Sequence, residues 1–325
     1  MSNVIKILAV TCVLGLFVGC GIQTNENRNE VMSDNDITNS STTRTSGELM
    51  ENLQSGEELK VQSSGDLQIN NEEMAQTGDE DITIEVIPVS NTNLSNTTHA
   101  WGFVRKKDNV QPEFSASYIK VLDDYEGIYV GNKADKVIYL TFDEGYENGY
   151  TGAILDTLKE KGVTAIFFVT MPYVKQNADL IQRMIDEGHI VGNHTVNHPS
   201  MPSVLDDAKL EEEITKLHDY VKENFGGYEM SYLRPPKGEY SERTVKIARD
   251  LGYRTVLWSS AYDDWDTSKQ DRLDYARKMI YNYTHNGCVM LLHAVSKDNT
   301  ALLGEAIDTL RATGYEFKSL DEFKY

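Results

Sequence analysis

The chain contains few cysteines: Cys12, Cys20 and Cys288 are the three among its 325 residues. The first two lie in an N-terminal apolar segment, so only Cys288 belongs to the body of the chain, which excludes a framework of disulfide bonds there. Cys288 directly precedes the apolar run 289–292. We therefore expect a small buried side chain, because no base stands near it in a pattern typical of a cysteine nucleophile.

The apolar segment near the N-terminus is too short to span a bilayer comfortably. It covers residues 7–18 behind Lys6 and has the length of the apolar region of a signal peptide. It ends in Phe17-Val18-Gly19-Cys20, which resembles a bacterial lipobox, in which Cys20 becomes the lipidated first residue. Phe17 departs from the usual leucine, so an uncleaved anchor stays an alternative. Residues 1–20 thus predict an exported protein held on the outer face of the cytoplasmic membrane.

Residues 21–100 lack aromatic side chains and show no sustained apolar period. They hold 15 acidic and 3 basic residues, a net charge of −12 out of −20 for the whole chain. This composition is typical of a disordered, solvated tether. The negative charge of the chain therefore says nothing about its substrate. One alternation of apolar and polar residues, 82–87, could form a strand.

From residue 101 onward apolar runs alternate with helical periods, which is typical of a single α/β domain over 101–325. The expected strands are 137–142, 165–169, 189–192, 232–234, 255–258 and 289–293. The expected helices are 149–160, 178–187, 210–225, 242–251, 272–283 and 302–312, and glycine follows four of them. This order predicts a parallel sheet, open or closed into a barrel. No basic stripe with interleaved aromatics occurs, which excludes nucleic acid as a partner.

Side chains able to do chemistry follow five of the six expected strands. They are Asp143 and Glu144 after the first strand, His194 and His198 after the third, Arg234 at the end of the fourth, Asp264 and Trp265 after the fifth, and His293 at the end of the sixth. Catalytic side chains of parallel α/β folds leave the C-terminal ends of strands. Each residue alone is compatible with a solvated turn, a helix cap or a core position, but together they predict one active site.

The types and spacing of these residues favour metal-assisted hydrolysis. Two histidines spaced i, i+4, His194 and His198, can reach one ion from a single helical turn. Asp143 and Glu144 leave the first strand at a turn formed by Gly145, so one carboxylate can face a metal while the other faces a substrate.

Five segments, in this order, resemble the motifs of the polysaccharide deacetylases, the carbohydrate esterases of NodB homology. The segments are Thr141-Phe142-Asp143-Glu144-Gly145, His194-Thr195-Val196-Asn197-His198, Arg234-Pro235-Pro236-Lys237-Gly238, Asp264-Trp265 and Leu291-Leu292-His293. The resemblance spans about residues 136–320 and implies the family's distorted (β/α) barrel. Within the family, segments 101–103, 146–150 and 292–299 look most like the PdaA-type, delta-lactam-forming peptidoglycan deacetylases of spore formers.

The resemblance implies a role for each matched residue. His194, His198 and Glu144 stand at the positions that ligate one divalent metal, commonly zinc. Asp143 stands at the position of the base that takes a proton from the attacking water. His293 stands at the position of the acid that protonates the departing amine.

The remaining matched residues would support this pair. Arg234 would hold Asp143 ionised, and Asp264 would orient His293 or Arg234. A backbone N–H near Lys237 would stabilise the oxyanion. Trp265 and Leu291 would form apolar walls for the sugar ring and the acetyl methyl group.

Three positions depart from the family's pattern. Glu144 replaces the usual aspartate, and its extra methylene moves the carboxylate by about an ångström. Ala261 stands where many members carry another aspartate. Lys237 replaces a common aromatic residue, and we hypothesise that it attracts an anionic group such as the lactyl carboxylate of N-acetylmuramic acid.

The resemblance therefore predicts a metal-dependent N-deacetylase of N-acetylmuramic acid in the glycan strands of peptidoglycan, serving muramic delta-lactam formation in the spore cortex. Two alternatives remain. One is deacetylation of N-acetylglucosamine in peptidoglycan or of another polysaccharide. The other is a catalytically silent wall-binding lipoprotein, in which Glu144 fails to hold the metal.

Overall fold

The computed structural model describes residues 93–324. The predicted signal peptide at 1–20, most of the predicted tether and the possible strand at 82–87 lie outside the described residues. Within the described range, no helix combines the length and the apolar character that crossing a membrane requires. The boundary at residue 100 stays a prediction.

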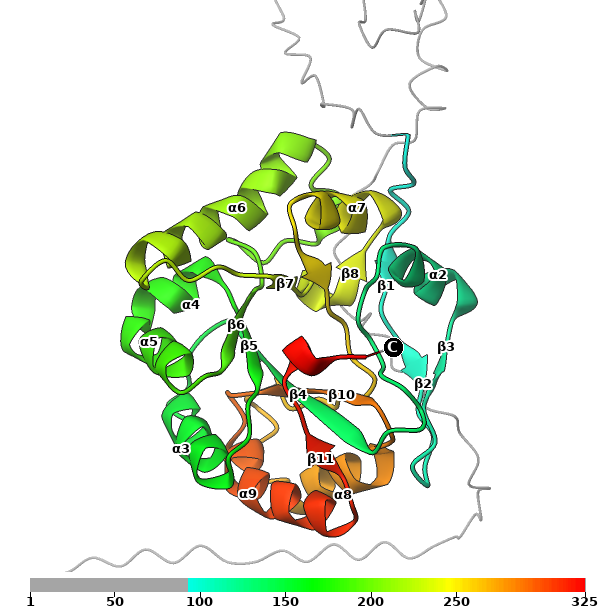
Figure 1. Ribbon diagram of the computed structural model, residues 1–325, viewed down its shortest axis with the longest axis vertical. Coiled ribbons are helices and arrows are strands. Elements are labelled where there is room, and N and C mark those ends of the chain that lie inside the picture. The colour runs from blue at the N-terminus through cyan, green and yellow to red at the C-terminus, as the bar shows by residue number, and fades with distance from the viewer. Residues whose placement is uncertain (1–92, 325) are drawn as a thin grey trace, which may run out of the picture. The chain divides into compact units, whose positions relative to one another are not determined.

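A curled parallel sheet forms the centre of the described fold (Figure 1). Its strands lie side by side in the order β10 (Cys288–His293), β4 (Val137–Glu144), β5 (Ile166–Val169), β6 (Ile190–Asn193), β7 (Tyr232–Leu233) and β9 (Arg254–Thr255). The short strand β11 (Glu316–Phe317) pairs with the start of β4. All of these pairs are parallel, as the alternation of apolar runs and helices predicts.

The sheet closes on itself through an irregular stretch rather than a strand. After β9 the chain runs back to β10, where Ser260 forms an isolated parallel bridge with Met290. The backbone N–H of Ser259 donates to the carbonyl oxygen of Val289 over 2.9 Å, and the N–H of Leu291 donates to that of Ser260 over 2.8 Å. The architecture is therefore the distorted (β/α) barrel that the resemblance implies.

Helices cover the outside of the barrel (Figure 1). They are α2 (Ala116–Asp124), α3 (Thr151–Lys161), α4 (Met171–Gln176), α5 (Ala178–Asp186), α6 (Asp207–Asn224), α7 (Glu242–Asp250), α8 (Leu273–Tyr283) and α9 (Lys297–Ala312). Two begin earlier than predicted because polar caps start them: Asp206 accepts from the backbone at the start of α6, and Ser296 does so for α9. Gly162, with a φ of 56°, ends α3 as predicted.

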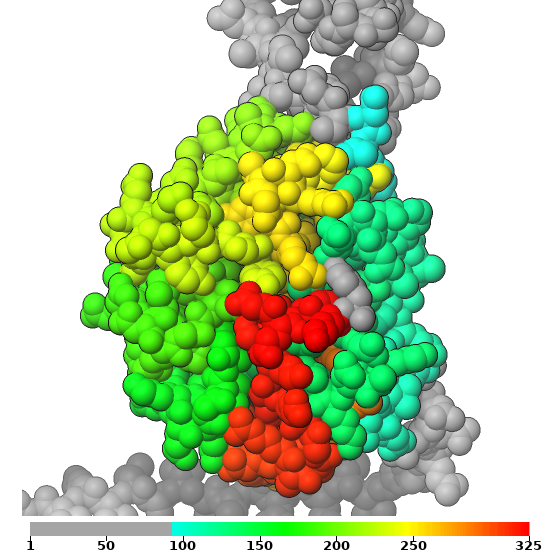
Figure 2. Space-filling model, in the orientation of Figure 1, coloured from blue at the N-terminus to red at the C-terminus, as the bar shows by residue number. Residues whose placement is uncertain are grey.

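Each face of the sheet packs into its own apolar layer. One, which includes Leu140 and Phe142 of β4, packs against the helices. The other fills the barrel near the strand starts and includes Tyr139 of β4. Leu320, in the short helix η4 (Leu320–Glu322), is buried in this inner layer, and Figure 2 shows the red C-terminal segment crossing this face. This segment covers the start of the barrel, and we call the other end, where the strands finish, the open end.

An N-terminal strap, residues 95–115, runs along one side of the barrel and is not predicted by the sequence. Its strands have two residues each: β1 (His99–Ala100) pairs with β8 (Glu239–Tyr240), and β2 (Phe103–Val104) pairs with β3 (Glu113–Phe114). Such short strands carry no detectable apolar period. The indole Nε1 of Trp101 donates to the carbonyl oxygen of Trp258 over 2.8 Å, and Arg105 Nη2 donates to that of Ala261 over 2.7 Å. The strap is thus tied to the stretch that closes the barrel.

The predicted burial of Cys288 is confirmed, since its side chain is free and buried at the start of β10. Burial raises the pKa of its thiol to about 12, so the thiol stays protonated.

Candidate active site

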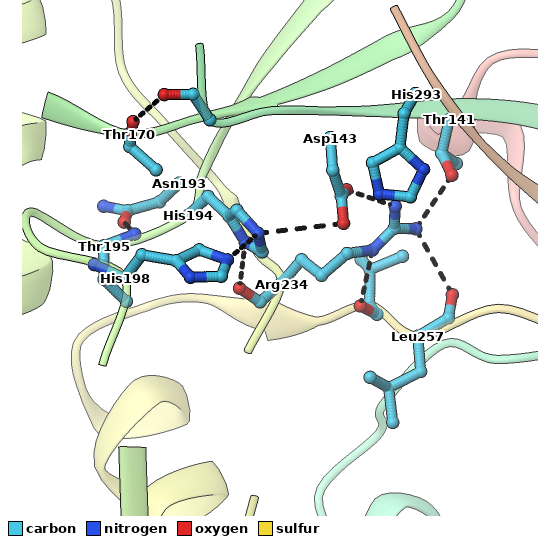
Figure 3. A network of polar contacts seen from close by, with 12 residues as sticks. Thr141, Asp143, Thr170, Asn193, His194, Thr195, His198, Arg234, Leu257 and His293 are labelled. Carbon is cyan, nitrogen blue, oxygen red and sulfur yellow. Dashed lines mark hydrogen bonds and ion pairs between the residues drawn. The ribbon is translucent and has the colours of Figure 1, made fainter. Parts of the chain in front are cut away.

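Asp143 and Arg234 form a buried ion pair at the open end of the barrel (Figure 3). Arg234 Nη1 donates to Asp143 Oδ1 over 2.7 Å, and Nη2 donates to Thr141 Oγ1 over 2.9 Å. The guanidinium also lies over the ring of Phe168, 4.3 Å from its centroid. Because the guanidinium is held on several sides, it fixes one oxygen of Asp143 and leaves Oδ2 for another partner.

The charge of Asp143 follows from these neighbours. Burial alone would raise the pKa of its carboxyl group, but the positive charge of Arg234 opposes this effect, with smaller contributions from the neighbouring His194 and His293. The pKa therefore lies below its ordinary value of 3.8. Asp143 is ionised at neutral pH and is able to accept a proton.

His293, at the end of β10, lies beside Asp143 because the parallel register of β10 and β4 pairs the two residues. Its Nδ1 donates to Asp264 Oδ1, and its backbone N–H donates to Asp264 Oδ2, both over 2.8 Å. Burial lowers the pKa of His293, but the charge and hydrogen bond of Asp264, then the charge of Asp143, raise it above 6.5 overall. These two carboxylates thus favour the imidazolium form of His293, in which Nε2 carries a proton that it can donate.

The two predicted metal ligands, His194 and His198, lie on a loop after β6 and not on a helical turn. Thr195 and His198 have φ values of 67° and 57°, in the left-handed region that a right-handed helix excludes. Thr195 N–H donates to Asn193 Oδ1 over 2.8 Å, and His198 N–H donates to Thr195 Oγ1 over 3.1 Å. This loop still brings the imidazoles together, with their Nε2 atoms 3.1 Å apart (Figure 3).

The charge states of the two histidines suit metal ligands. His194 Nδ1 donates to the carbonyl oxygen of Arg234 over 2.8 Å, which leaves its Nε2 with the lone pair in the neutral ring. Burial lowers the pKa of His194. Burial above all, then the nearby His194, lowers the pKa of His198 to about 4, and the positive charge of Lys237 adds to this effect. Both rings are therefore neutral at pH 7 and able to ligate.

Glu144 does not join the two histidines, in contrast to the predicted ligand set. The predicted strand ends at Phe142, but β4 continues through Glu144, which pairs with Val169 of β5. Successive side chains of a strand face opposite sides, so Glu144 shares the helix-covered face with Phe142, while Asp143 faces the site.

The surroundings of Glu144 agree with this position. Its carboxyl group is 0% exposed, and neither oxygen has a hydrogen-bond partner among residues 93–324. Burial, then the negative charges of Glu147 and Asp143, raises its pKa well above 4.5. Glu144 is therefore held as a neutral acid against the helices.

The site fits a divalent ion only in part. No three histidine, cysteine, aspartate or glutamate side chains gather as a metal site in the described part of the chain. His194 and His198 present two converging nitrogens, and Asp143 Oδ2 lies 3.7 Å from His194 Nε2. The two histidines thus suit two ligand positions of an ion, and the third predicted ligand is elsewhere.

Lys237 lies on a tight turn beside this site, with a φ of 59° and a ψ of 7°. Gly238 N–H donates to the carbonyl oxygen of Pro235 over 3.1 Å, so it is not free for a substrate. Trp101 N–H donates to the carbonyl oxygen of Gly238 over 3.0 Å, and a Cβ at Gly238 would lie 2.9 Å from Trp101 Cβ. Lys237 itself is exposed and has no ion pair with another described residue. The strap therefore holds a turn that presents an uncompensated positive charge.

The two predicted apolar walls differ in exposure. Trp265 is 47% exposed on the loop after the closing stretch. Leu291 is buried and shares the face of β10 with His293, two residues away. Trp265 can thus contact a large ligand, whereas Leu291 lies beneath the site.

Two residues of the site lie in segments that carry the resemblance, but the sequence alone assigns neither of them a role. Thr141 accepts from Arg234, and Asn299 donates from the first turn of α9 to Asp264. Asn299 ends the segment 292–299, whose resemblance indicates a subfamily but not a contact with Asp264. Ser296 is a typical first residue of a helix and lies close to the end of a strand. A polar residue three positions after it, Asn299, is the signal that could have indicated this contact.

Comparison with known proteins gives consistent results. Residues 130–256 match the family model described as polysaccharide deacetylase. The chain is 42% identical over 225 residues to the peptidoglycan-N-acetylmuramic acid deacetylase PdaA of Bacillus subtilis, which covers 69% of this chain and 85% of that protein. It is 46% identical over 229 residues to an uncharacterised 30.6 kDa protein of Geobacillus stearothermophilus, which covers 70% of this chain and 86% of that protein.

A solved structure resembles the fold as well. The structure of Bacillus subtilis PdaA, described as a family 4 carbohydrate esterase, superposes with a TM-score of 0.69 at 41% identity. The match covers 71% of this chain and 98% of that one.

Proposed function

This chain belongs to the polysaccharide deacetylase family, hydrolases of amide bonds, and from that premise we propose that it removes the acetyl group from N-acetylmuramic acid in peptidoglycan. One observation carries the chemistry: an ionised carboxylate, Asp143, and a protonated imidazole, His293, lie at paired positions of neighbouring strands. A base and an acid side by side are what hydrolysis of an unreactive amide requires. The similarity to PdaA supports muramic acid as the sugar.

In the first step Asp143 acts as the base. Its Oδ1 is held by Arg234, so Oδ2 takes a proton from water while the water oxygen bonds to the acetyl carbon. The carbonyl oxygen gains a negative charge. Pro235 and Pro236 have no N–H and that of Gly238 is already bonded, so the N–H of Lys237 is the backbone donor of this turn left for the oxyanion.

In the second step His293 acts as the acid. Its Nε2 gives a proton to the amide nitrogen as the carbon–nitrogen bond breaks, and acetate and a free amine result. The carboxylate of Asp264 stabilises the imidazolium before this transfer. The proton that Asp143 accepted then passes through water to His293, which returns both groups to their starting forms.

We propose that His194 and His198 hold the divalent ion on which deacetylases of this family generally depend, with zinc as the expected ion. Such an ion, when bound, would lower the pKa of the attacking water and polarise the acetyl carbonyl. The third protein ligand is not Glu144 in its described position.

The chemistry of Lys237 suits the distinction between muramic acid and glucosamine, because only the former carries a lactyl carboxylate. Lys237→Tyr should lower kcat/KM for deacetylation of N-acetylmuramic acid by about two- to fivefold, the range for an exposed ion pair. It should leave kcat/KM for deacetylation of N-acetylglucosamine unchanged. Lys237→Arg, which keeps the charge, is the control. Mass spectrometry of both products measures the ratio, and an unchanged ratio in Lys237→Tyr would contradict the role of the charge.

The pKa shifts predict the pH profile of kcat/KM. His293 must be protonated and has a pKa above 6.5, so activity should decline about tenfold per pH unit above that raised pKa. Asp143 has a pKa below 3.8, and His198 titrates at about 4, so activity should persist down to roughly pH 5. Acetate release measured at constant ionic strength gives the profile. An alkaline decline that survives in His293→Gln would refute the assignment.

The biological setting is a proposal that rests on the sequence and on the similarity to PdaA. We infer that Cys20 or an uncleaved anchor holds the protein on the outer face of the cytoplasmic membrane. There its product amine on muramic acid would serve formation of the delta-lactam in spore cortex.

Acetate release tests the proposed function. Purified protein is incubated with peptide-free glycan strands, with and without a chelator, and mass spectrometry locates the free amines. Amines on muramic acid, lost with chelator and regained with zinc, are expected. Amines on glucosamine alone would favour a glucosamine deacetylase, and no release at all would favour a silent wall-binding protein.

A further inference from the structure

Three hydrogen bonds converge on the carboxylate of Asp264, and one of them comes from Asn299, to which the sequence alone assigns no role. His293 supplies two, from Nδ1 to Oδ1 and from its backbone N–H to Oδ2. Asn299 Nδ2 supplies the third, to Oδ2. Asn299 lies in the first turn of α9, where its backbone N–H donates to Ser296 Oγ over 3.2 Å. The backbone of α9 is therefore anchored where the side chain meets Asp264.

The amide of Asn299 has one possible orientation. Tyr262 donates its hydroxyl proton to Asn299 Oδ1, and a carboxylate such as Asp264 only accepts. The NH2 group must then face Asp264, and it also lies 3.2 Å from the carbonyl oxygen of His293. Asn299 and Tyr262 are both buried. A chain of hydrogen bonds thus runs from Tyr262 through Asn299 and Asp264 to His293.

We propose that Asn299, held by Tyr262, is a positioning residue that fixes the carboxylate of Asp264 and through it the imidazolium of His293. This role rests on the proposed function, in which His293 is the acid. The side-chain amide of Asn299 contacts His293, Asp264 and the tyrosine that orients it, as expected of a residue that supports a catalytic group.

The charged groups that face this chain of hydrogen bonds come from several elements and act on the pKa of His293 and of Tyr262. His293 is influenced by Asp143 of β4, by Arg234 after β7 and by Asp264. The pKa of Tyr262 is raised by burial above all and then by the negative charges of Asp264 and Asp298, whereas Arg272 lowers it. Arg272 donates its backbone N–H to Asp298 Oδ2 over 2.9 Å, and its guanidinium pairs with Asp263 Oδ2 over 3.2 Å.

Two variants of Asn299 test the role with the full chain. Asn299→Leu removes the donor and should lower kcat about tenfold with KM changed less than about twofold. Asn299→Asp keeps the shape but adds a carboxylate beside Asp264, which should raise the pKa of His293 and move the alkaline decline of kcat/KM to higher pH. Tyr262→Phe, which frees the amide, should give a smaller loss of kcat than Asn299→Leu. Asn286→Leu, the same change at an amide that donates to the carbonyl oxygen of Lys133 outside the network, should leave all values unchanged.

The outcomes separate this role from the proposed function. Acetate release by the wild-type protein together with an unmoved alkaline decline in Asn299→Asp would overturn the positioning role alone. The positioning role is equally overturned if Asn299→Leu lowers the melting temperature but not the kcat of the folded fraction. No acetate release by the wild-type protein would overturn the proposed function and this role with it.

Discussion

Replacing Asp143 by asparagine should lower kcat for acetate release by about a thousandfold, the size expected for loss of a general base. The variant keeps the shape of the side chain, and its amide oxygen can still accept from Arg234 Nη1. It cannot take a proton from water. KM should change little, because the carboxylate is used in the reaction and not in holding the glycan.

Two controls make this result specific. The first control is Asp263→Asn, which makes the same change at an aspartate that pairs with Lys269 and Arg272 and not with Arg234. This variant should keep nearly full activity. Asp143→Asn leaves the buried guanidinium of Arg234 without its anionic partner, so kcat is compared for the folded fraction of each protein, which circular dichroism measures. Retention of more than a tenth of the wild-type kcat would show that another group accepts the proton.

Replacing Arg234 by methionine should lower the stability of the protein and remove most of its activity. The guanidinium is 0% exposed, and its loss leaves the carboxylate of Asp143 buried without its ionic partner. Removing one partner of a buried pair costs about 3–5 kcal/mol of unfolding free energy. Because burial then dominates, the pKa of Asp143 rises, and any residual activity should need a higher pH.

The double variant Arg234→Met with Asp143→Asn provides the control. Neutralising the buried carboxylate removes most of the penalty, so the double variant should be more stable than Arg234→Met alone. Urea titrations of the four proteins give the coupling free energy. Strict additivity of the two single effects would contradict a direct interaction between the two side chains.

Most of the barrel can be predicted because its strands are continuous apolar runs that differ from their helices in period. The end of β4 shows where this reasoning stops. The run 137–142 is apolar, and Asp143 looks like the first residue of a turn, yet pairing with β5 extends the strand by two residues. Polar strand residues are stabilised by partners distant in sequence, which no local pattern reveals.

The same limit explains the errors in the site. Alternation along the extended strand separates Asp143 from Glu144, so residues adjacent in sequence face opposite layers. Spacing i, i+4 suggests a helical turn for His194 and His198, but a loop with two left-handed residues brings the rings together equally well. The ion pair with Arg234 is predicted by the family resemblance, and both residues lie at the ends of strands of one sheet. The contact of Asn299 could not be predicted, since it depends on where α9 begins.

The pairing of β10 with β4 allows the residues that contact the sugar to change while the distance between the reacting residues stays the same. Backbone hydrogen bonds, not loops, set the interval between His293 and Asp143, and neighbouring strands lie about 4.8 Å apart in any sheet. Loops that carry Lys237 and Trp265 can thus be exchanged or lengthened without altering the reacting pair. Redesign of this protein for another acetylated sugar should begin on those loops and leave both strands untouched.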